Sequence, residues 1–403
     1  MILLSYIRFV FYMKKVAFFS EILIEDFDGA SRTMFQIINR IDPIAFSYLF
    51  IYGKGSMEFE NHQSYQVPTF RIPINDDYSF AVPQLSKWKL EETLDHFAPD
   101  IIHIATPSLL GFFAMNYAKR NNIPILSIYH THFVSYIAYY LRNLSSLIKP
   151  VQYWMRKAMI RFYNNCQKVY VPANNIMEEL KEIGIQSDRL TLWQRGIDLE
   201  LFNPQKANPE YIRKITNNDK PNILFASRLV WEKNIQTLID IYHQLKKSDL
   251  VYNLIIAGDG SAKEEAQELM PDAFFLGKLD HDELSKLYAS ADVFLFTSTS
   301  ETYGNVVIEA MASGLPCVIA NGGGSSSLVE HGHSGFKCVP NNALEYIYFI
   351  HKILSNEKLK LEIKEAGLAY VKKLDWEKLA ERYFQDLQEL ASEPINTLAW
   401  VGT

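Results

Sequence analysis

The chain has 403 residues, of which 48% are hydrophobic and 21% charged, and its formal net charge is −6 at pH 7. This composition excludes a disordered or collagen-like chain and a small disulfide-held scaffold, and the length predicts two or three domains. Cys166, Cys317 and Cys338 are widely spaced, which excludes a cysteine-based structural zinc site and favours a reducing compartment. No apolar run reaches the ~20 residues that a membrane-spanning helix needs. We therefore expect a soluble, cytoplasmic protein with more than one core.

The first twelve residues are apolar, but Arg8 interrupts them and no small-residue cleavage site follows. A signal peptide is therefore not expected. The sequence KKVAFFS after Met13 is typical of a first buried strand, and the fold is expected to begin at Met13.

Short apolar runs alternate with amphipathic stretches along the rest of the chain. The pattern predicts a first series of strands and helices, then a polar, proline-containing connector, then a second series. In the first series we expect strands at 16–20, 45–52, 100–105, 123–129 and 168–173, and helices around 30–41, 85–97, 108–121 and 133–165. The connector is expected at 205–221, and the second-series strands at 222–227, 252–258, 273–277, 292–298 and 316–320.

Strand–helix alternation of this kind predicts an α/β protein with two doubly wound, Rossmann-like domains that face each other across a cleft. We expect the domains at 13–203 and 204–374, with ligands bound beyond the carboxyl ends of the strands. The amphipathic stretch at 375–391 could pack on either domain, and we expect it to complete the first.

The charge is unevenly distributed, because no Asp or Glu lies between Ile101 and Met177 while eight Lys or Arg residues do. Within this basic segment, 133–168 interleaves aromatic, aliphatic and cationic residues. One interpretation is a helix pair at an anionic membrane surface, where each Lys or Arg contributes about 1 kcal/mol. The other is a buried helix pair with solvated cations. Nucleic acid is not an expected partner, because no motif for groove reading or base stacking accompanies the charge.

Two cations follow the first strand of the second series. In ASRLVWEKN (226–234), Arg228 and Lys233 lie five residues apart at the end of the strand where ligands are expected. A guanidinium and an ammonium at this spacing can hold a diphosphate from two sides. Either residue alone would more often be a solvated surface cation.

Two glutamates follow a later strand, in SETYGNVVIEAMASG (300–314). Glu301 is expected in the loop and Glu309 in the helix that follows, with Gly304 between them. The glycine permits close backbone approach, and the free N–H groups of the helix start can face an anion. Cations, amide donors and carboxylates that accept hydroxyl groups together predict a site for a sugar attached to a nucleoside diphosphate.

The chain also resembles the retaining glycosyltransferases of family 4, which have the two-domain GT-B fold. The resemblance rests on ASRLVWEKN, IIAGDG, the stretch from LGKLDHDEL to LPCVIA, and GHSGF, in this order, with two glutamates separated by seven residues. In the first half, DGASRTMFQIINRI, IYHTHF and WQRGIDLELFNP are similar to the glycine loop, the histidine segment and the segment entering the connector. The last two are most similar to the branch that glycosylates lipids, such as sulfolipid synthases and mannosyl or glucosyl diacylglycerol enzymes.

The resemblance implies an acceptor-side first domain and a second domain that binds the nucleotide sugar. Arg228 and Lys233 would neutralise the departing diphosphate. Glu301 would hold the hydroxyl groups of the donor sugar, and Glu309 the ribose. The diphosphate is then neutralised by protein cations, and transfer without a metal ion or other cofactor is expected.

The remaining implied roles concern the backbone and one histidine. Backbone amides at Tyr303, Gly304 and Asn305 would meet phosphate or sugar oxygens, and Gly29 would let the first domain approach the diphosphate. His130 would lie near the C6 hydroxyl of the sugar, with His132 as the rival position. For either histidine a purely structural role is an open alternative.

The sequence departs from the family pattern at three places. Ser227 replaces a glycine, Tyr303 replaces a phenylalanine, and NGGGSSSLVEHG (321–332) lacks the usual Pro-Glu. The identity of the donor is therefore left open between UDP- and GDP-hexoses. The acceptor is expected to be a membrane lipid or lipid-linked glycan, with the protein at the inner face of the plasma membrane. A soluble acceptor, a nucleotide-sugar epimerase and a non-catalytic sensor are the alternatives.

Overall fold

The computed structural model describes residues 13–25, 27–55, 59, 62–71, 79–130, 145–248 and 250–392. The stretch 1–12, the rival position His132 and the first part of the expected helix 133–165 lie outside these residues.

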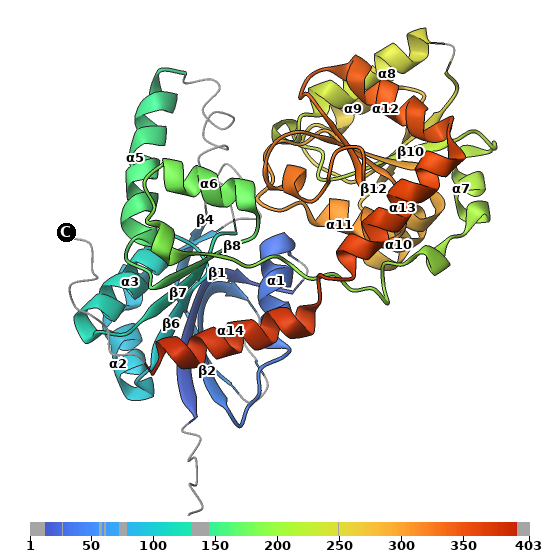
Figure 1. Cartoon of the computed structure of the whole chain (residues 1–403). Helices are drawn as coiled ribbons and strands as arrows, with labels where there is room; N and C mark the ends of the chain where they lie inside the picture. Colours follow the sequence, from blue (N-terminus) through green and yellow to red (C-terminus); the bar gives the residue numbers. More distant parts are fainter. Residues whose placement is uncertain are drawn as a thin grey trace, which may run out of the picture.

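The described residues form two parallel sheets, each flanked by helices, that belong to separate lobes (Figure 1). The first sheet has seven strands in the order β3-β2-β1-β6-β7-β8-β9. Its strands are β1 (Lys14–Leu23), β2 (Phe46–Gly55), β3 (Gln63–Gln66), β6 (Ile101–Ile104), β7 (Ile125–Ile128), β8 (Lys168–Val171) and β9 (Leu190–Leu192). A short antiparallel pair, β4 (Thr69–Arg71) and β5 (Ser79–Ala81), lies beside it.

The second sheet has six strands in the order β12-β11-β10-β13-β14-β15. They are β10 (Asn222–Ala226), β11 (Asn253–Ala257), β12 (Phe274–Gly277), β13 (Val293–Phe296), β14 (Cys317–Ala320) and β15 (Gly335–Cys338). Most strand residues of this sheet are buried and apolar, as expected for parallel strands covered on both faces. The order of the strands reverses at the pair β10–β13, and it is after these two strands that Arg228, Lys233 and Glu301 follow.

The helices lie on both faces of each sheet (Figure 1). Those of the first lobe are α1 (Gly29–Ile38), α2 (Lys87–Phe97), α3 (Leu109–Asn121), α5 (Ser145–Tyr163) and α6 (Asn174–Glu182). Those that follow are α7 (Pro209–Thr216), α8 (Ile235–Lys247), α9 (Lys263–Leu269), α10 (His281–Ser290), α11 (Asn305–Ala312), α12 (Ala343–Leu354), α13 (Glu357–Val371) and α14 (Trp376–Leu390).

The expected connector 205–221 is partly wrong, because α7 occupies its centre. Asn208 caps this helix by accepting a hydrogen bond from the Tyr211 amide at 3.2 Å, and Pro209 follows at the first helical position, where proline is well tolerated. Ile212 is buried in the core of the second lobe. Pro209, one of the two prolines that indicated a linker, therefore begins a short amphipathic helix.

The chain crosses between the lobes twice, and α14 returns to the first lobe (Figure 1). Tyr383 and Leu387 of α14 belong to the core cluster on one face of the first sheet. The indole Nε1 of Trp193 donates to the carbonyl of Leu379 at 3.0 Å. The final helix is thus held by burial and by side-chain to backbone hydrogen bonding, at a point close to the first crossing.

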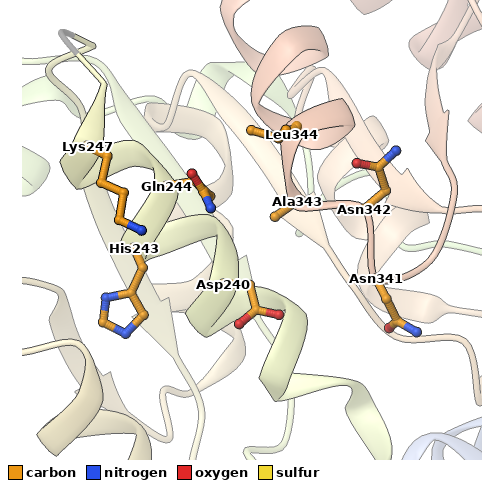
Figure 2. Close-up of a pocket in the computed structure, with 8 residues that line it drawn as sticks. All are labelled: Asp240, His243, Gln244, Lys247, Asn341, Asn342, Ala343 and Leu344. Atoms are coloured by element: carbon orange, nitrogen blue, oxygen red, sulfur yellow. The ribbon is translucent and has the colours of Figure 1, made fainter.

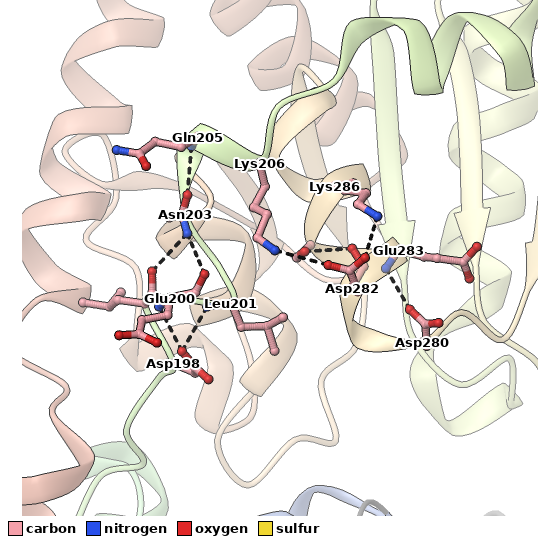
Figure 3. A network of polar contacts seen from close by, with 12 residues as sticks. Asp198, Glu200, Leu201, Asn203, Gln205, Lys206, Asp280, Asp282, Glu283 and Lys286 are labelled. Atoms are coloured by element: carbon pink, nitrogen blue, oxygen red, sulfur yellow. Dashed lines mark hydrogen bonds and ion pairs between the residues drawn. The ribbon is translucent and has the colours of Figure 1, made fainter.

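The first crossing is stiffened by local polar contacts (Figure 3). The carboxylate of Asp198 accepts from the amides of Glu200 and Leu201 at 2.9 and 3.0 Å. Lys206 then pairs with Asp282 of α10 at 3.2 Å, which ties the segment to the second lobe. The segment that follows Arg195 is therefore held by its own hydrogen bonds and by an ion pair to the second lobe.

Candidate functional site

Polar residues meet where the two lobes touch. The hydroxyl of Thr302 donates to the backbone carbonyl of His130 at 2.8 Å, and the hydroxyl of Tyr303 donates to that of Arg195 at 3.0 Å. From α6, Asn175 donates to the carbonyl of Gly323 at 2.5 Å. The loops after β13 and β14 are therefore held directly against residues at the carboxyl end of the first sheet.

Lys233 and Glu301 form a close ion pair within this region. The Nζ of Lys233 lies 2.6 Å from Oε1 of Glu301, and the lysine side chain is only 5% exposed. The hydroxyl of Ser298 donates to the same carboxylate oxygen at 3.3 Å. Burial alone would raise the pKa of Glu301, but Lys233 and Arg228 outweigh it and the pKa lies below its ordinary value. Glu301 is therefore an ionised acceptor at neutral pH.

Arg228 is exposed at the end of β10, and its charge acts on Glu301 across the site. The two cations of ASRLVWEKN thus have different surroundings. Lys233 is buried and paired with a carboxylate, whereas Arg228 can reach a ligand from solvent. The structure brings both of them to the part of the site that contains Glu301.

Gly304 is the N-cap residue of α11 and has a φ of +104°, which favours glycine. A Cβ at this position would lie 2.6 Å from the Cβ of Ser325, so close packing also requires glycine. The amide of Gly324, in the loop that lacks Pro-Glu, donates to the carbonyl of Glu301 at 2.6 Å. The loop 321–332, which departs from the family pattern, is therefore packed against the segment that contains Glu301 and Gly304.

Glu309 is buried in the second half of α11 and has two partners. The hydroxyl of Tyr288 donates to its Oε2 at 3.3 Å, and Nη1 of Arg32 lies 3.4 Å from its Oε1. Nη1 of Arg32 is also 2.7 Å from Nε2 of His281. Because Arg32 belongs to α1, this ion pair joins the two lobes. Sequence reasoning did not single out Arg32, although it lies in the segment similar to the family's glycine loop.

Gly29 lies at the start of α1, where Asp28 caps the helix by accepting from the amide of Ser31 at 2.8 Å. A Cβ at Gly29 would lie 3.1 Å from Nδ2 of Asn305 and 3.3 Å from Nη1 of Arg195. The predicted phosphate loop of the first lobe and the start of α11 are therefore in near contact. Sequence reasoning did not single out Arg195 either. The only indication of a role was its position as a cation within the WQRGID motif.

His130 follows β7 and is 7% exposed. Neither of its ring nitrogens has a hydrogen-bond partner among the described residues. Burial, and then the charges of Arg195 and His103, hold its pKa well below the ordinary value. His130 is therefore a neutral imidazole at neutral pH, with hydrogen-bonding capacity that no described residue uses.

Comparison with family models agrees with this geometry. Residues 27–201 match the model described as Glycosyltransferase Family 4, and residues 208–369 match the one described as Glycosyl transferases group 1. The chain belongs to the family 4 glycosyltransferases. The recognition made from the motifs is confirmed, and the protein is a hexosyltransferase.

Several curated proteins are similar to this glycosyltransferase. It is 35% identical over 290 residues to the sulfoquinovosyl transferase SQD2 of Arabidopsis thaliana, an alignment that covers 70% of this chain and 54% of that protein, so the chain spans about half of its length. It is 28% identical to a GDP-mannose-dependent alpha-mannosyltransferase of Corynebacterium glutamicum, covering 92% of this chain and 88% of that one. An alpha-monoglucosyldiacylglycerol synthase of Streptococcus pneumoniae is 29% identical, covering 67% and 62%.

Solved structures confirm the fold. The Anabaena protein Alr3699/HepE, crystallised in complex with UDP and glucose, superposes with a TM-score of 0.70 at 20% identity, covering 94% of this chain and all of that one. The expected α/β architecture of two facing Rossmann-like domains, the GT-B fold, is therefore confirmed.

A surface hollow of this glycosyltransferase lies on the second lobe (Figure 2). It is formed between α8 and the start of α12, with Asp240, His243 and Lys247 on one side and Asn341 and Asn342 on the other. None of the predicted site residues lines it. We therefore do not assign this hollow to the donor.

Proposed function

We propose that the chain moves a hexose from a UDP- or GDP-hexose to a membrane lipid or lipid-linked glycan, with retention of anomeric configuration and without a metal ion. The observation that carries the proposal is the buried Lys233–Glu301 pair at 2.6 Å, with Arg228 exposed beside it. This arrangement joins a cation for a phosphate with an ionised acceptor for sugar hydroxyls. The GDP-mannose-dependent relatives and the UDP-bound Anabaena structure support these two donor classes.

The cations would act on the leaving group. When the bond between the anomeric carbon and the phosphate oxygen breaks, negative charge grows on the diphosphate. Arg228 and Lys233 would lie at that charge before it develops, so they would stabilise the transition state more than the bound donor. Attack by the acceptor hydroxyl on the same face, with its proton passing to the leaving phosphate, would retain the configuration.

The glutamates would orient the two ends of the donor. Glu301, ionised because of Lys233 and Arg228, would accept hydrogen bonds from hexose hydroxyls. Glu309, fixed by Tyr288 and Arg32, would accept them from the ribose. A ligand held at both ends places its reacting bond reproducibly, which lowers the entropic part of the barrier.

Metal independence is proposed because protein cations face the proposed diphosphate. The chain contains two D-x-D pairs, at 26–28 and 280–282. Asp28 caps α1, Asp280 caps α10, and Asp282 pairs with Lys206 and Lys286. These carboxylates are engaged in the fold. Turnover that is unchanged by EDTA supports the proposal, and turnover restored only by added Mg²⁺ or Mn²⁺ contradicts it.

The proposed lipid acceptor is supported by the surface of α5. Tyr153 and Trp154 are 52% and 68% exposed, and the ammonium of Lys157 lies 4.7 Å and 5.9 Å from their ring centroids. Aromatic and cationic side chains on one helix suit an anionic headgroup region. No helix in the described ranges is long and apolar enough to span a bilayer. We propose peripheral binding at the cytoplasmic face of the plasma membrane.

The proposal is tested by nucleotide release from UDP-glucose, UDP-galactose and GDP-mannose, with a membrane-lipid extract or an aqueous extract as acceptor. We expect nucleotide release only when the lipid extract is present, and from donors of one nucleobase, either uracil or guanine. Proton NMR of the glycolipid product should show the same anomeric configuration as in the donor. Release with only the aqueous extract indicates a soluble acceptor. Conversion of the sugar without any acceptor indicates an epimerase. Binding without either reaction indicates a sensor.

A further inference from the structure

Arg195 is a buried cation at the junction of the two lobes. Its side chain is 7% exposed, and it lies in the segment that leaves β9 for the second lobe. Its Nη1 lies 3.4 Å from the carbonyl oxygen of Gly29 and 3.3 Å from Oδ1 of Asn305. The guanidinium is therefore placed between the start of α1 and the start of α11.

The position of Arg195 is fixed by Tyr303. The tyrosine hydroxyl donates to the Arg195 carbonyl at 3.0 Å, and the guanidinium carbon lies 5.8 Å from the centroid of the same ring. Both residues are buried. The guanidinium is thus held in one place before any ligand binds, and binding would require little further ordering of this side chain.

The charge of Arg195 is not neutralised by a direct ion pair. Its hydrogen-bond acceptors are two neutral oxygens at long distances, and no carboxylate of the described residues lies within ion-pair distance. Burial lowers its pKa to about 10, although the charges of Asp28 and Glu301 act in the opposite direction. A buried cation is costly unless an anion compensates it, and guanidinium groups bind phosphate oxygens in charge-assisted hydrogen bonds.

We propose that Arg195 binds the donor diphosphate from the first-lobe side, opposite Arg228 and Lys233. This inference rests on the proposed function, because it assigns a third cation to the same substrate. Gly29 and Asn305, which accept from Nη1 of Arg195, are both among the residues expected to approach the phosphates. The diphosphate would then be enclosed by cations from both lobes, and its full binding strength would require the lobes to be together.

The test compares the affinities of nucleoside diphosphate and nucleoside monophosphate by calorimetry, using UDP and UMP or GDP and GMP. Arg195→Gln keeps amide donors for the carbonyl of Gly29 and the amide oxygen of Asn305 but removes the charge. We expect the diphosphate affinity of this variant to fall about 10- to 100-fold, the loss typical of a charge-assisted hydrogen bond. The monophosphate affinity should change much less, and Arg195→Lys should recover part of the loss.

The matched control is Arg120→Gln, which removes an exposed arginine paired with Glu91 far from the site. It should leave both affinities unchanged. Equal losses of diphosphate and monophosphate affinity in Arg195→Gln would mean that Arg195 only ties the lobes, and would overturn the inference. Unchanged affinities would also overturn it. If the unaltered chain binds neither UDP nor GDP, the proposed function itself fails.

Discussion

The ammonium of Lys233 lies 2.6 Å from the carboxylate of Glu301, although 68 residues separate them in the chain. Lys233 follows β10 and Glu301 follows β13, and these two strands are neighbours in the second sheet. The parallel sheet therefore brings Lys233, proposed to bind the phosphates, into direct contact with Glu301, proposed to bind the sugar. Replacing either residue therefore leaves the other without its charged partner and should lower the free energy of unfolding.

Replacing Lys233 with Met should reduce turnover about 10²- to 10³-fold, the effect typical of losing one preorganised group that stabilises developing charge. The variant should also lose about 1–3 kcal/mol of unfolding free energy, because Glu301 is left without its charged partner in a buried place. Steady-state kinetics and urea unfolding measure the two effects. The double variant Lys233→Met with Glu301→Gln should regain stability but not turnover. Recovery of both would mean that the pair has only a structural role.

Arg228→Gln should separate catalysis from stability. Because Arg228 is exposed, its replacement should change the unfolding free energy by no more than about 0.5 kcal/mol. Turnover should nevertheless fall about 10²-fold, since the departing diphosphate loses a guanidinium. Near-normal turnover in a purified, folded Arg228→Gln protein would contradict the assignment of ASRLVWEKN to the diphosphate.

Glu309→Gln should weaken nucleoside binding. A Gln side chain replaces one acceptor oxygen of Glu309 with an NH2 group, and the loss of a hydrogen bond to the ribose hydroxyls predicts an affinity for UMP or GMP about tenfold lower. Calorimetry with the monophosphates measures this without interference from the diphosphate cations. Glu264→Gln, on the exposed face of α9, is the control and should bind normally. Normal binding by Glu309→Gln would remove Glu309 from the ribose site.

The buried His103 should make the fold sensitive to acid. Its Nδ1 is 2.8 Å from the hydroxyl of Tyr383, and burial lowers its pKa to about 3. Between pH 8 and pH 5 the unfolded chain binds a proton at this residue while the folded chain does not, so stability falls by about 2 kcal/mol from this group alone. Urea unfolding at both pH values should show a smaller decrease in His103→Gln. His96→Gln, on the exposed face of α2, should behave like the unaltered chain; equal decreases in all three proteins would contradict this account.

The proposed membrane surface of α5 can be tested with a matched pair of variants. Trp154→Ser with Lys157→Glu should reduce binding to anionic vesicles at least about tenfold, because one charge reversal removes about 2 kcal/mol near such a surface. On α12, Lys352 lies 5.9 Å from the ring of the exposed Tyr348, a similar cation–aromatic pair in the second lobe. The variant Tyr348→Ser with Lys352→Glu should bind anionic vesicles as well as the unaltered chain does, as measured by vesicle flotation. Equal loss in both variants would mean a nonspecific effect of charge, and no binding of the unaltered chain at low salt would end the membrane proposal.

The regular part of the fold was accessible from the sequence because buried parallel strands are continuous apolar runs. NILFAS and DVFLFTS predicted β10 and β13 closely, and the motifs after them predicted where Lys233 and Glu301 would come together. The short strands β3, β4, β5, β9 and β15 were not foreseen. Their runs are brief and several are half exposed, so tertiary pairing decides their conformation.

The contacts between the lobes could not be predicted from the sequence. No periodicity indicates that Arg32 of α1 would reach Glu309 of α11, or that Arg195 would lie between Gly29 and Asn305. These pairs depend on how two independently folded sheets meet. The sequence placed each arginine in a motif, but only the three-dimensional arrangement gave it a partner.

A crystal structure of the chain with UDP-glucose or GDP-mannose, whichever it binds, tests the central claim most directly. The account predicts phosphate oxygens within hydrogen-bond distance of Arg228 and Lys233, sugar hydroxyls on Glu301 and ribose hydroxyls on Glu309. A well-ordered donor bound elsewhere, with none of these four side chains touching it, would contradict the account.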